Sequence, residues 1–344
     1  PEAAEAAVHA MCEEFGNPSS LHRMGLEASH LLEDSRRTVA SALGCLPEEV
    51  YFTACGTEST NISLRGAAHL NRHKKGRIIT AKQLAADGFD VVFLAPDATG
   101  HITPEVLSEA LTEDTILLSC QLVNNEIGTV QPVEQLGKLL KAKAPKALFH
   151  IDAVQGLCRV RLTPKKWNCD LMSVSGHKIG APKGIGALYV KKGLRLPPLT
   201  FGGGQERGMR PGTEAVPNIA AFAKACEIRM AHFDEDYAYL KQQVSAELPD
   251  AVINGEGDIP HVVNLSMPGC KSEVMLHVLE GDEVYISSGS ACSKGKQSGV
   301  LKALGLPKAR TDSALRVSFA PFNTKEDVDA FVAAVKKGAK MFRR

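Results

Sequence analysis

The sequence has few aromatic residues, almost no net charge and no long apolar run, and each shortage excludes a class of protein. Aromatic residues make up 5% of the 344 residues, which argues against surfaces on which nucleic-acid bases stack. Forty Lys and Arg against 39 Asp and Glu leave a formal charge of +1, so no basic excess predicts a nucleic-acid or membrane-surface partner. No run approaches the roughly 18 apolar residues of a membrane-spanning helix.

A secretory leader and a metal motif are also missing. The first residues, Pro1 to Ala4, begin neither a basic segment nor an apolar one, so we expect no signal peptide. The nine cysteines are an odd number with irregular spacing, and none has the spacing to another cysteine or a histidine that is typical of a zinc site. We therefore expect reduced thiols in a cytoplasmic protein without a metal site.

Short apolar runs rich in β-forming residues alternate with helical patterns between residues 51 and 190. This alternation predicts βαβ units and a mostly parallel sheet covered on both faces. We expect a large α/β domain over 16–233 and a smaller α+β domain over 234–344, the latter joined by 1–15. The expected strands are 77–80, 90–94, 115–120, 147–152, 171–175, 186–190, 261–266, 284–287 and 315–318.

One connection between expected strands is short. Only ten residues separate Thr80 from Val91, whereas a crossover between parallel strands needs about a dozen or more. We therefore expect that these two strands are not parallel neighbours, unless the natural protein carries further residues between them.

Two charged residues stand at the ends of successive expected strands. Lys178 follows the strand over 171–175, where a desolvated lysine can form a Schiff base; a surface lysine is the alternative. Asp152 ends the preceding strand, at the edge where ligands bind to open α/β sheets. It can hold a pyridinium nitrogen protonated or cap a helix. An aspartate followed 26 residues later by a lysine, each at a strand end, indicates pyridoxal phosphate (PLP).

A third segment carries small residues and hydroxyls where a helix is expected to begin. Gly56 and Thr57 follow an apolar run and precede a helical pattern. Backbone N–H groups at such a terminus bind anions, so a phosphate ester fits there. A simple helix cap by Thr57 or Ser59 is the alternative, and the sequence permits both.

Two segments near the C-terminus present a thiol and a guanidinium. Cys292 lies in a loop of small residues with Lys294 and Lys296 nearby, and nearby cations favour the nucleophilic thiolate. The other eight cysteines are expected to be small packing residues. Arg316 lies on an expected strand, where a buried arginine can bind a carboxylate through two hydrogen bonds; a surface ion pair is the alternative.

Together these segments resemble the cysteine desulfurases of the NifS/IscS type, which belong to the class V aminotransferases of PLP fold type I. The resemblance implies an aspartate aminotransferase-like large domain, a smaller C-terminal domain and a homodimer. The matching motifs follow the family's order through nearly the whole chain and are residues 15–22, 52–61, 123–128, 150–155, 173–178, 202–213 and 287–292.

The resemblance also implies individual roles. Lys178 binds the cofactor aldehyde and later moves the α-proton of the substrate, and Cys292 accepts the sulfur. The substrate carboxylate binds Arg316, and the substrate also contacts Asn125. The implied cofactor-binding residues are Gly56, Thr57, Asn125, Asp152, Gln155, Ser175, His177, Lys178 and Thr213, of which Thr213 reaches in from a second subunit.

The implied reaction converts L-cysteine into L-alanine, with the sulfur held as a persulfide on Cys292. An acceptor or scaffold protein would then take it for iron–sulfur cluster assembly or tRNA thiolation. A selenocysteine lyase, another class V enzyme and an inactive PLP-fold scaffold stay open as alternatives. The joint presence of Lys178, Asp152 and Cys292 weighs against the scaffold, which needs none of them.

Two features of the family have no counterpart in this sequence. One is an N-terminal strand with the motif Asp-Asn-Ala-Ala-Thr-Thr. The other is the histidine that stacks on the PLP ring, in a Glu-His motif after the strand that ends at Thr80. The second gap falls in the connection that is short on geometric grounds. The hypothesis is that the natural protein carries both segments, which the mass of the intact protein would test.

Overall fold

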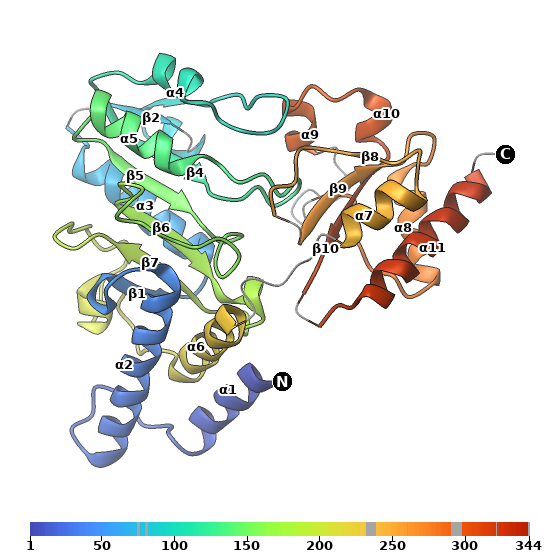
Figure 1. The fold of residues 1–344 in the computed structure, drawn as a ribbon. Coiled ribbons are helices and arrows are strands. Elements are labelled where there is room, and N and C mark those ends of the chain that lie inside the picture. The colour runs from blue at the N-terminus through green and yellow to red at the C-terminus, as the bar shows by residue number, and fades with distance from the viewer. Residues whose placement is uncertain are drawn as a thin grey trace. The chain divides into compact units, whose positions relative to one another are not determined.

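The computed structural model describes residues 1–73, 76–79, 82–231, 239–259, 261–289, 298–320 and 322–342. The chain forms two compact units (Figure 1). A domain is a part that can fold alone, and compactness by itself does not test this. The domain limits expected from the sequence, with residues 1–15 joined to the smaller domain, therefore stay a prediction. The first unit comprises Pro1–Leu94, Pro104–Leu122 and Pro132–Phe233, and the second Ala95–Thr103, Val123–Gln131 and Asp234–Arg344.

A seven-stranded sheet in the order β1-β7-β6-β5-β4-β2-β3 forms the centre of the first unit. The neighbours from β6 to β3 pair in parallel, whereas β7 pairs antiparallel with both of its neighbours, β6 and β1. The expectation of a mostly parallel α/β sheet is therefore confirmed. The strands are β1 (Val50–Thr53), β2 (Arg77–Ile79), β3 (Asp90–Val92), β4 (Thr115–Gln121), β5 (Leu148–Asp152), β6 (Leu171–Ser175) and β7 (Gly186–Val190).

Helices cover both faces of this sheet (Figure 1). Helix α3 shares a core cluster with Leu148 of β5, while Gly137 of α5 lies against Phe149, the next residue along β5. Successive strand residues point to opposite faces, so α3 and α5 lie on opposite sides. The helices of this unit are α1 (Glu2–Cys12), α2 (Arg23–Leu43), α3 (Gly56–Leu70), α4 (Pro104–Ala110), α5 (Val133–Lys143) and α6 (Val216–Ala231), with one-turn helices η1 (Pro47–Glu49), η2 (Lys82–Ala85), η3 (Gly176–Ile179) and η4 (Gln205–Gly208).

The pairing of β2 with β3 decides one of the two alternatives left open for the short connection after Thr80. The two strands are parallel neighbours, with Arg77 opposite Asp90, and the Arg77 Nε donates to the Asp90 Oδ2 at 2.7 Å. The one-turn helix η2 takes the place of a full crossover helix. The short connection was expected to allow this pairing only if the natural protein carries further residues there, and that alternative stays a prediction.

His150 joins three neighbouring strands inside the first unit. Its Nδ1 lies 2.8 Å from the Ser119 Oγ of β4, and its Nε2 lies 2.8 Å from the Ser173 Oγ of β6. The ring is fully buried, and burial lowers the pKa of His150 to about 3. The fold therefore holds this histidine neutral, because a charged ring would be costly to bury.

This burial predicts a pH dependence of stability. The pKa of His150 is lower in the folded state than its unfolded value of ~6.5. The contribution of the neutral ring to the free energy of unfolding is therefore complete above pH ~6.5 and is lost as the pH falls toward 3. Between pH 7.5 and 5.5, urea unfolding should show the wild type losing about 1.4 kcal/mol more stability than His150→Gln. The exposed His277 serves as control, since His277→Gln should keep the wild-type dependence. Equal losses in all three proteins would contradict a neutral buried His150.

The second unit is built on the antiparallel sheet β10-β9-β8. Apolar side chains of β9, β10, α7, α8 and α11 share one core cluster, which gives the α+β arrangement expected for the C-terminal part of the chain. The elements are α7 (Tyr239–Glu247), β8 (Val252–Ile253), β9 (Val262–Ser266), α8 (Ser272–Gly281), α9 (Gly299–Ala303), α10 (Lys308–Thr311), β10 (Ala314–Ser318) and α11 (Lys325–Phe342).

The expectation of a strand over 284–287 is wrong. Only Ser287 pairs, in an isolated bridge with Arg316 of β10. The segment begins in the turn that ends α8, where Glu283 has a left-handed φ of 59° and the Val284 N–H donates to the Leu279 carbonyl. Since the backbone at Val284 is bonded to the helix end, it is not available for a sheet.

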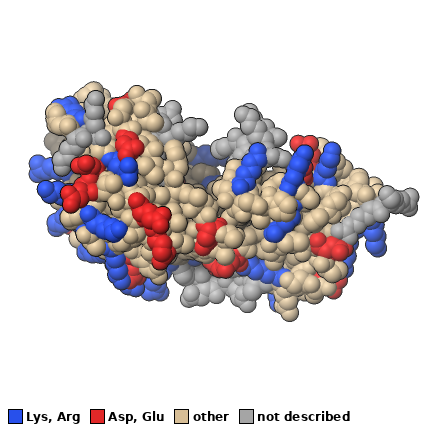
Figure 2. Space-filling model, turned by 90° about the horizontal axis from the view of Figure 1, so that it is seen from above, with Lys and Arg blue, Asp and Glu red and all other residues tan. Residues whose placement is uncertain are grey.

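Acidic and basic side chains are interspersed on the face drawn in Figure 2, which shows no continuous basic area among the residues described there. This agrees with the near-zero formal charge. Within the described ranges, no helix combines the length and apolar character needed to cross a membrane.

Candidate active site

Asp152 stands at the carboxyl end of β5, in the middle of the parallel part of the sheet. Its backbone pairs with Gln121 of β4 and Ser173 of β6, and its Oδ1 accepts a hydrogen bond from the Val154 N–H at 3.0 Å. Burial raises the pKa of Asp152, and the Val154 hydrogen bond only partly opposes this. No lysine or arginine in the described ranges pairs with the carboxylate, so a positively charged ligand atom would stabilise its ionised form.

Lys178 lies one strand away, at the same edge of the sheet. Strand β6 is buried along its whole length and ends at Ser175, and η3 then carries His177 and Lys178 before Gly180 turns the chain with φ 95°. The Ser175 Oγ lies 2.8 Å from the His177 Nδ1. Burial, and secondly the charges of Lys178 and Lys183, lower the pKa of His177, so its ring is neutral near pH 7.

Arg159 ties the loop after β5 to the turn that carries Lys178. Its Nη1 donates to the Gln155 Oε1 at 2.7 Å, and its Nη2 donates to the Lys178 carbonyl at 3.0 Å. The guanidinium fixes two carbonyl-type oxygens at once, which orders both segments. Arg159 was not predicted from the sequence, since its position four residues after the motif at 150–155 gave no local signal.

The amino end of α3 completes this edge of the sheet. A Cβ on Gly56 would lie 2.6 Å from the Val154 Cγ2 and 3.4 Å from the Ser175 Cβ. The helix therefore begins directly beside the loop that follows Asp152 and the end of β6, and only glycine leaves room for that approach. Cys55 is the N-cap residue and makes no side-chain cap, so the cap by Thr57 or Ser59 is not formed. The first-turn N–H groups stay oriented to receive an anion.

The segment over 202–213 is held by a buried ion pair. Glu206 has a left-handed φ of 46°, and its carboxylate accepts two hydrogen bonds from Arg36, at 2.8 and 2.9 Å, and one from the Phe52 N–H at 2.8 Å. Sequence analysis included Glu206 in a motif without giving it a role. The pair anchors the segment on α2 and β1.

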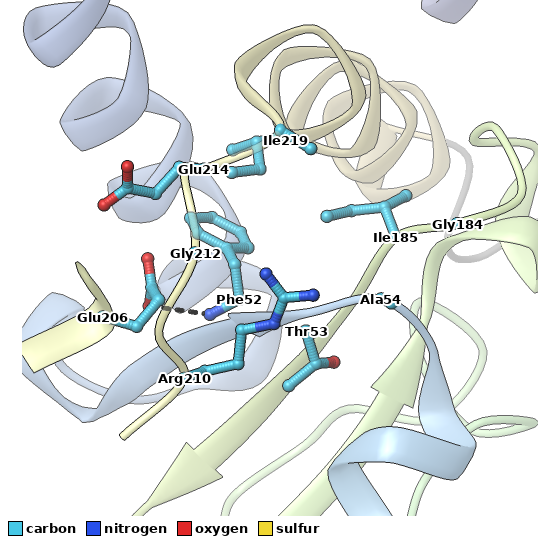
Figure 3. Close-up of a pocket in the computed structure, with 11 residues that line it drawn as sticks. Phe52, Thr53, Ala54, Gly184, Ile185, Glu206, Arg210, Gly212, Glu214 and Ile219 are labelled. Carbon is cyan, nitrogen blue, oxygen red and sulfur yellow. Dashed lines mark hydrogen bonds between the residues drawn. The ribbon is translucent and has the colours of Figure 1, made fainter. Parts of the chain in front are cut away.

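A pocket lies between this segment, the end of β1 and the start of α6 (Figure 3). Arg210 extends across it, and its Nε lies 3.2 Å from the Glu58 Oε1 of α3. Thr213 is exposed on the same loop, between two pocket residues, Gly212 and Glu214. Thr213 is therefore open to contacts from outside this chain.

These residues of the first unit fit PLP. Asp152 offers a carboxylate without a cationic partner, Lys178 an amine at the adjacent strand end, and the first turn of α3, beginning at Gly56, an uncapped helix terminus for the phosphate. The connection between β2 and β3 contains no histidine, so it provides no imidazole to stack on the ring. The contacts that Asp152, Lys178 and the α3 terminus offer do not depend on such an imidazole.

The second unit holds Arg316 and Asn125 together. The Arg316 Nη1 donates to the Asn125 carbonyl at 3.3 Å, and its buried Nε has no hydrogen-bond partner among the described residues. Burial lowers the pKa of Arg316, and the nearby Glu126 carboxylate partly offsets this. A half-buried guanidinium whose buried Nε has no partner among the described residues is suited to a carboxylate ligand.

Glu126 is a second residue that the sequence analysis left without a role. It is buried, and its carboxylate accepts a hydrogen bond from the Ser298 Oγ at the start of α9. Asn124 shapes the same loop, because its Oδ1 accepts from the N–H groups of Glu126 and Ile127 at 2.8 and 3.1 Å. Glu126 thus links the loop beside Arg316 to α9.

The loop that carries Cys292 is described only at its start. The Gly289 N–H donates to the Ser287 Oγ at 3.2 Å, and Ser287 bridges to Arg316. Cys292, Lys294 and Lys296 lie outside the described residues. The role expected for Cys292 therefore stays a prediction.

The fold and the first-unit residues define a PLP-binding α/β protein of fold type I. Residues 1–331 match the model of the family "Aminotransferase class-V". The chain belongs to this family, whose members depend on PLP.

Individual relatives agree with this membership. The chain is 38% identical to a "Cysteine desulfurase IscS" of Methanosarcina thermophila, over 97% of this chain and 87% of that protein. Among solved structures, it is similar to a "NIFS-LIKE PROTEIN" with TM-score 0.90 and 34% identity, over 99% of this chain and 95% of the other. "SspA in complex with cysteine" is similar with TM-score 0.82 and 30% identity, over 94% and 96%.

Proposed function

We propose that this protein is a PLP-dependent cysteine desulfurase that converts L-cysteine into L-alanine. The observation that carries the proposal is the meeting of Asp152, Lys178 and the α3 terminus at Gly56 along one edge of a class V aminotransferase sheet. Relatives named cysteine desulfurase, and the solved complex of one similar protein with cysteine, support the choice of substrate.

Asp152, the α3 terminus and neighbouring side chains would hold the cofactor. When bound, PLP supplies an electron-accepting ring that spreads negative charge away from the substrate Cα. The Asp152 carboxylate would accept a hydrogen bond from a protonated ring nitrogen, which maintains that capacity. The phosphate would bind the first-turn N–H groups at Gly56 and Thr57, with Ser175 and His177 beside them, and Gln155 and Asn125 would approach the ring hydroxyl.

Lys178 would bind the cofactor through its Nζ and, once displaced by the substrate amine, would act as the base at the substrate Cα. An amine placed at this atom can take the α-proton and return it to another carbon. The Arg159 hydrogen bond to the Lys178 carbonyl keeps η3 in place during this exchange. Arg316 would bind the substrate carboxylate through the Nε that has no partner among the described residues.

Cys292 would take the sulfur. Its thiolate attacks the substrate sulfur, an S–S bond forms, and the substrate C–S bond breaks with its electron pair left on carbon. Protonation of that carbon releases alanine, and the sulfur stays on Cys292 as a persulfide. The sum, L-cysteine plus a thiol giving L-alanine plus a persulfide, needs no external oxidant or reductant. An acceptor protein then removes the sulfur by the same kind of thiol attack.

We also propose a cytoplasmic homodimer in which Thr213 contacts the phosphate of the partner's site. Thr213 is exposed on a loop anchored by Glu206. Apolar side chains are exposed on the same unit, among them Leu21, Phe15 and Phe201, and such groups favour burial against another chain.

Replacing Cys292 tests the sulfur-transfer role. With PLP, L-cysteine and a thiol reductant, the wild type should form alanine and sulfide in equal amounts. Cys292→Ser should lower both rates by about 10²-fold or more, because the nucleophile is lost, while PLP absorbance is kept. Cys12→Ser, which alters an exposed thiol on α1, should have wild-type rates. Full-rate sulfide release by Cys292→Ser would overturn the role of Cys292, and no alanine from the wild type would overturn the proposed function.

A further inference from the structure

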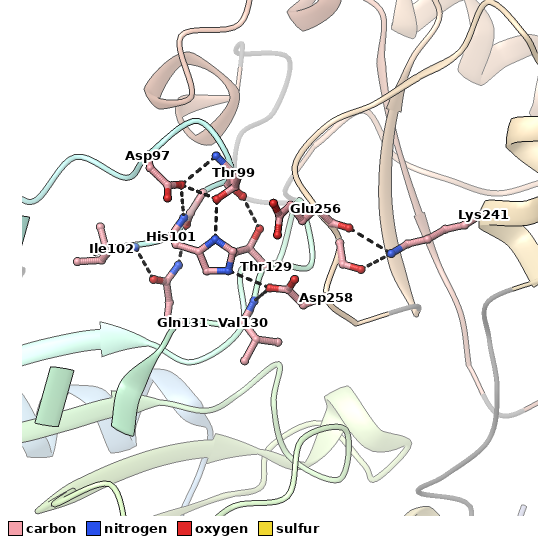
Figure 4. Close-up of polar contacts among 12 residues, drawn as sticks. Asp97, Thr99, His101, Ile102, Thr129, Val130, Gln131, Lys241, Glu256 and Asp258 are labelled. Carbon is pink, nitrogen blue, oxygen red and sulfur yellow. Dashed lines mark hydrogen bonds and ion pairs between the residues drawn. The ribbon is translucent and has the colours of Figure 1, made fainter. Parts of the chain in front are cut away.

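Three side chains of residue types that bind metals in other proteins, none of them given a role above, meet in the second unit (Figure 4). One ligand atom each from His101, Glu256 and Asp258 lies within 4.8 Å of the others. His101 is 157 residues from Asp258, yet its Nε2 lies 3.1 Å from the Asp258 Oδ2. We propose that these residues bind one divalent transition-metal cation of the Zn²⁺ type.

The hydrogen bonds around His101 orient its ring for this role. The Asp97 Oδ1 accepts from the backbone N–H groups of Thr99 and His101, both at 2.9 Å, and from the Thr99 hydroxyl at 2.6 Å. The Thr99 hydroxyl has a single proton, which this bond uses. Its oxygen lies 2.6 Å from the His101 Nδ1, so it accepts there and the proton is on Nδ1.

This assignment leaves the Nε2 as the ring nitrogen that can bind a metal ion. It faces the Asp258 Oδ2 at 3.1 Å, and that oxygen already accepts from the Val130 N–H at 2.7 Å. A cation between the Nε2 and the Oδ2 interacts favourably with both atoms. A carboxylate or hydroxyl bound to the other ring nitrogen is the usual support of a metal-binding histidine.

The charge of the cluster also suits a divalent cation. The charged side chains labelled in Figure 4 are Asp97, Glu256, Asp258 and Lys241, so three negative charges and one positive charge leave −2. The Lys241 ammonium is bonded to the backbone carbonyls of Glu256 and Gly257, which leaves the Glu256 carboxylate available. An ion of charge +2 makes the cluster neutral.

The ligand set selects the kind of metal. Imidazole nitrogen with two carboxylates suits Zn²⁺ and its neighbours, whereas Ca²⁺ and Mg²⁺ prefer oxygen alone. Zn²⁺ binds such atoms at about 2.0–2.2 Å, so its ligands lie roughly 3.4 Å apart. His101 and Asp258 are near that separation. The ligand atom of the exposed Glu256 lies within 4.8 Å of the other two, so it has to move inward by at most about 1.4 Å. A water would be the fourth ligand.

A metal here would fasten three chain segments of the second unit to one another. His101 lies in 95–103, the ligands Glu256 and Asp258 lie in the loop between β8 and β9, and Asp258 also holds the Val130 N–H of 123–131. The last segment carries Asn125, whose carbonyl accepts from Arg316. The metal would therefore steady the loop whose Asn125 carbonyl accepts a hydrogen bond from Arg316.

Metal titration of the full-length protein tests this proposal. The exposed thiol of Cys12 and the proposed catalytic thiol of Cys292 are first removed by Cys12→Ser and Cys292→Ser, because thiols also bind Zn²⁺. After treatment with a chelator, calorimetry with Zn²⁺ should show one equivalent bound, and Co²⁺ should give visible bands without sulfur charge transfer. Thr99→Val, which removes the support of His101, should weaken binding by about 10–100-fold, and His101→Ala by at least as much.

Two variants keep the result interpretable. Glu256→Gln removes one ligand but leaves the contact between His101 and Asp258, so it should lose affinity even if His101→Ala does not fold. His277→Ala alters an exposed histidine beside Glu280 and should bind like the parent. If no metal binds, or if Glu256→Gln and His101→Ala bind as tightly as the parent, the proposal is overturned and the three side chains are held only by their contacts within the chain.

Discussion

Substitution of Lys178 by alanine is expected to abolish alanine formation from L-cysteine. The substitution removes both the amine that would bind the cofactor and the base at the substrate Cα, and loss of general acid–base catalysis alone lowers rates by about 10²–10⁴-fold. The visible absorbance of lysine-bound PLP should disappear, while free PLP can still bind through Asp152 and the α3 terminus. Stopped assays for alanine and absorbance spectra measure both effects.

Lys183 provides a matched control for Lys178. It lies in the same glycine-rich turn, five residues further on, and is exposed. Lys183→Ala should keep the absorbance band and the wild-type rate, apart from a small rise in the pKa of His177, which Lys183 helps to lower. A retained absorbance band in Lys178→Ala would show that another lysine binds the cofactor.

Breaking the buried pair of Glu206 and Arg36 should have the largest effect on stability. Both side chains are almost fully buried, and the carboxylate also accepts from the Phe52 N–H. Removing one partner leaves an uncompensated buried charge, which typically costs about 3–5 kcal/mol. Urea unfolding should therefore show Glu206→Met destabilised by that amount.

A double substitution separates the cost of the unpaired charge from the loss of the contact. In Arg36→Met/Glu206→Met the unpaired guanidinium is gone, so the double variant should be more stable than Glu206→Met alone. Glu134→Gln, which affects an exposed pair with Lys138, should change the unfolding midpoint little. If the double variant is no more stable than Glu206→Met, the pair is not what anchors the segment over 202–213.

The proposed cofactor and metal sites differ in what the sequence reveals of them. Asp152 ends a buried β-rich run and Lys178 follows another by three residues, and strand ends are local features of sequence. His101 and Asp258 carried no such signal, because they lie 157 residues apart. Spacing along the chain, on which the expectation of no metal site was based, does not detect side chains that only folding brings together.

The error in the fold expectations has the same origin. Residues 284–287 are rich in β-formers, yet the turn after α8 bonds the Val284 N–H to the Leu279 carbonyl and prevents a strand. A neighbouring element therefore decided this outcome. The parallel pairing of β2 and β3 across the short link after Thr80 was likewise not readable from the length of the link alone.

The sequence by itself determined the mostly parallel sheet, the placement of Asp152 and Lys178 at its edge and the family of the protein, because alternation of apolar runs and short motifs are written in adjacent residues. Only the tertiary structure decided that Glu206 pairs with Arg36, that Arg159 ties Gln155 to Lys178, and that His101 meets Asp258. These contacts join distant parts of the chain, and their geometry depends on how the elements pack rather than on any local pattern.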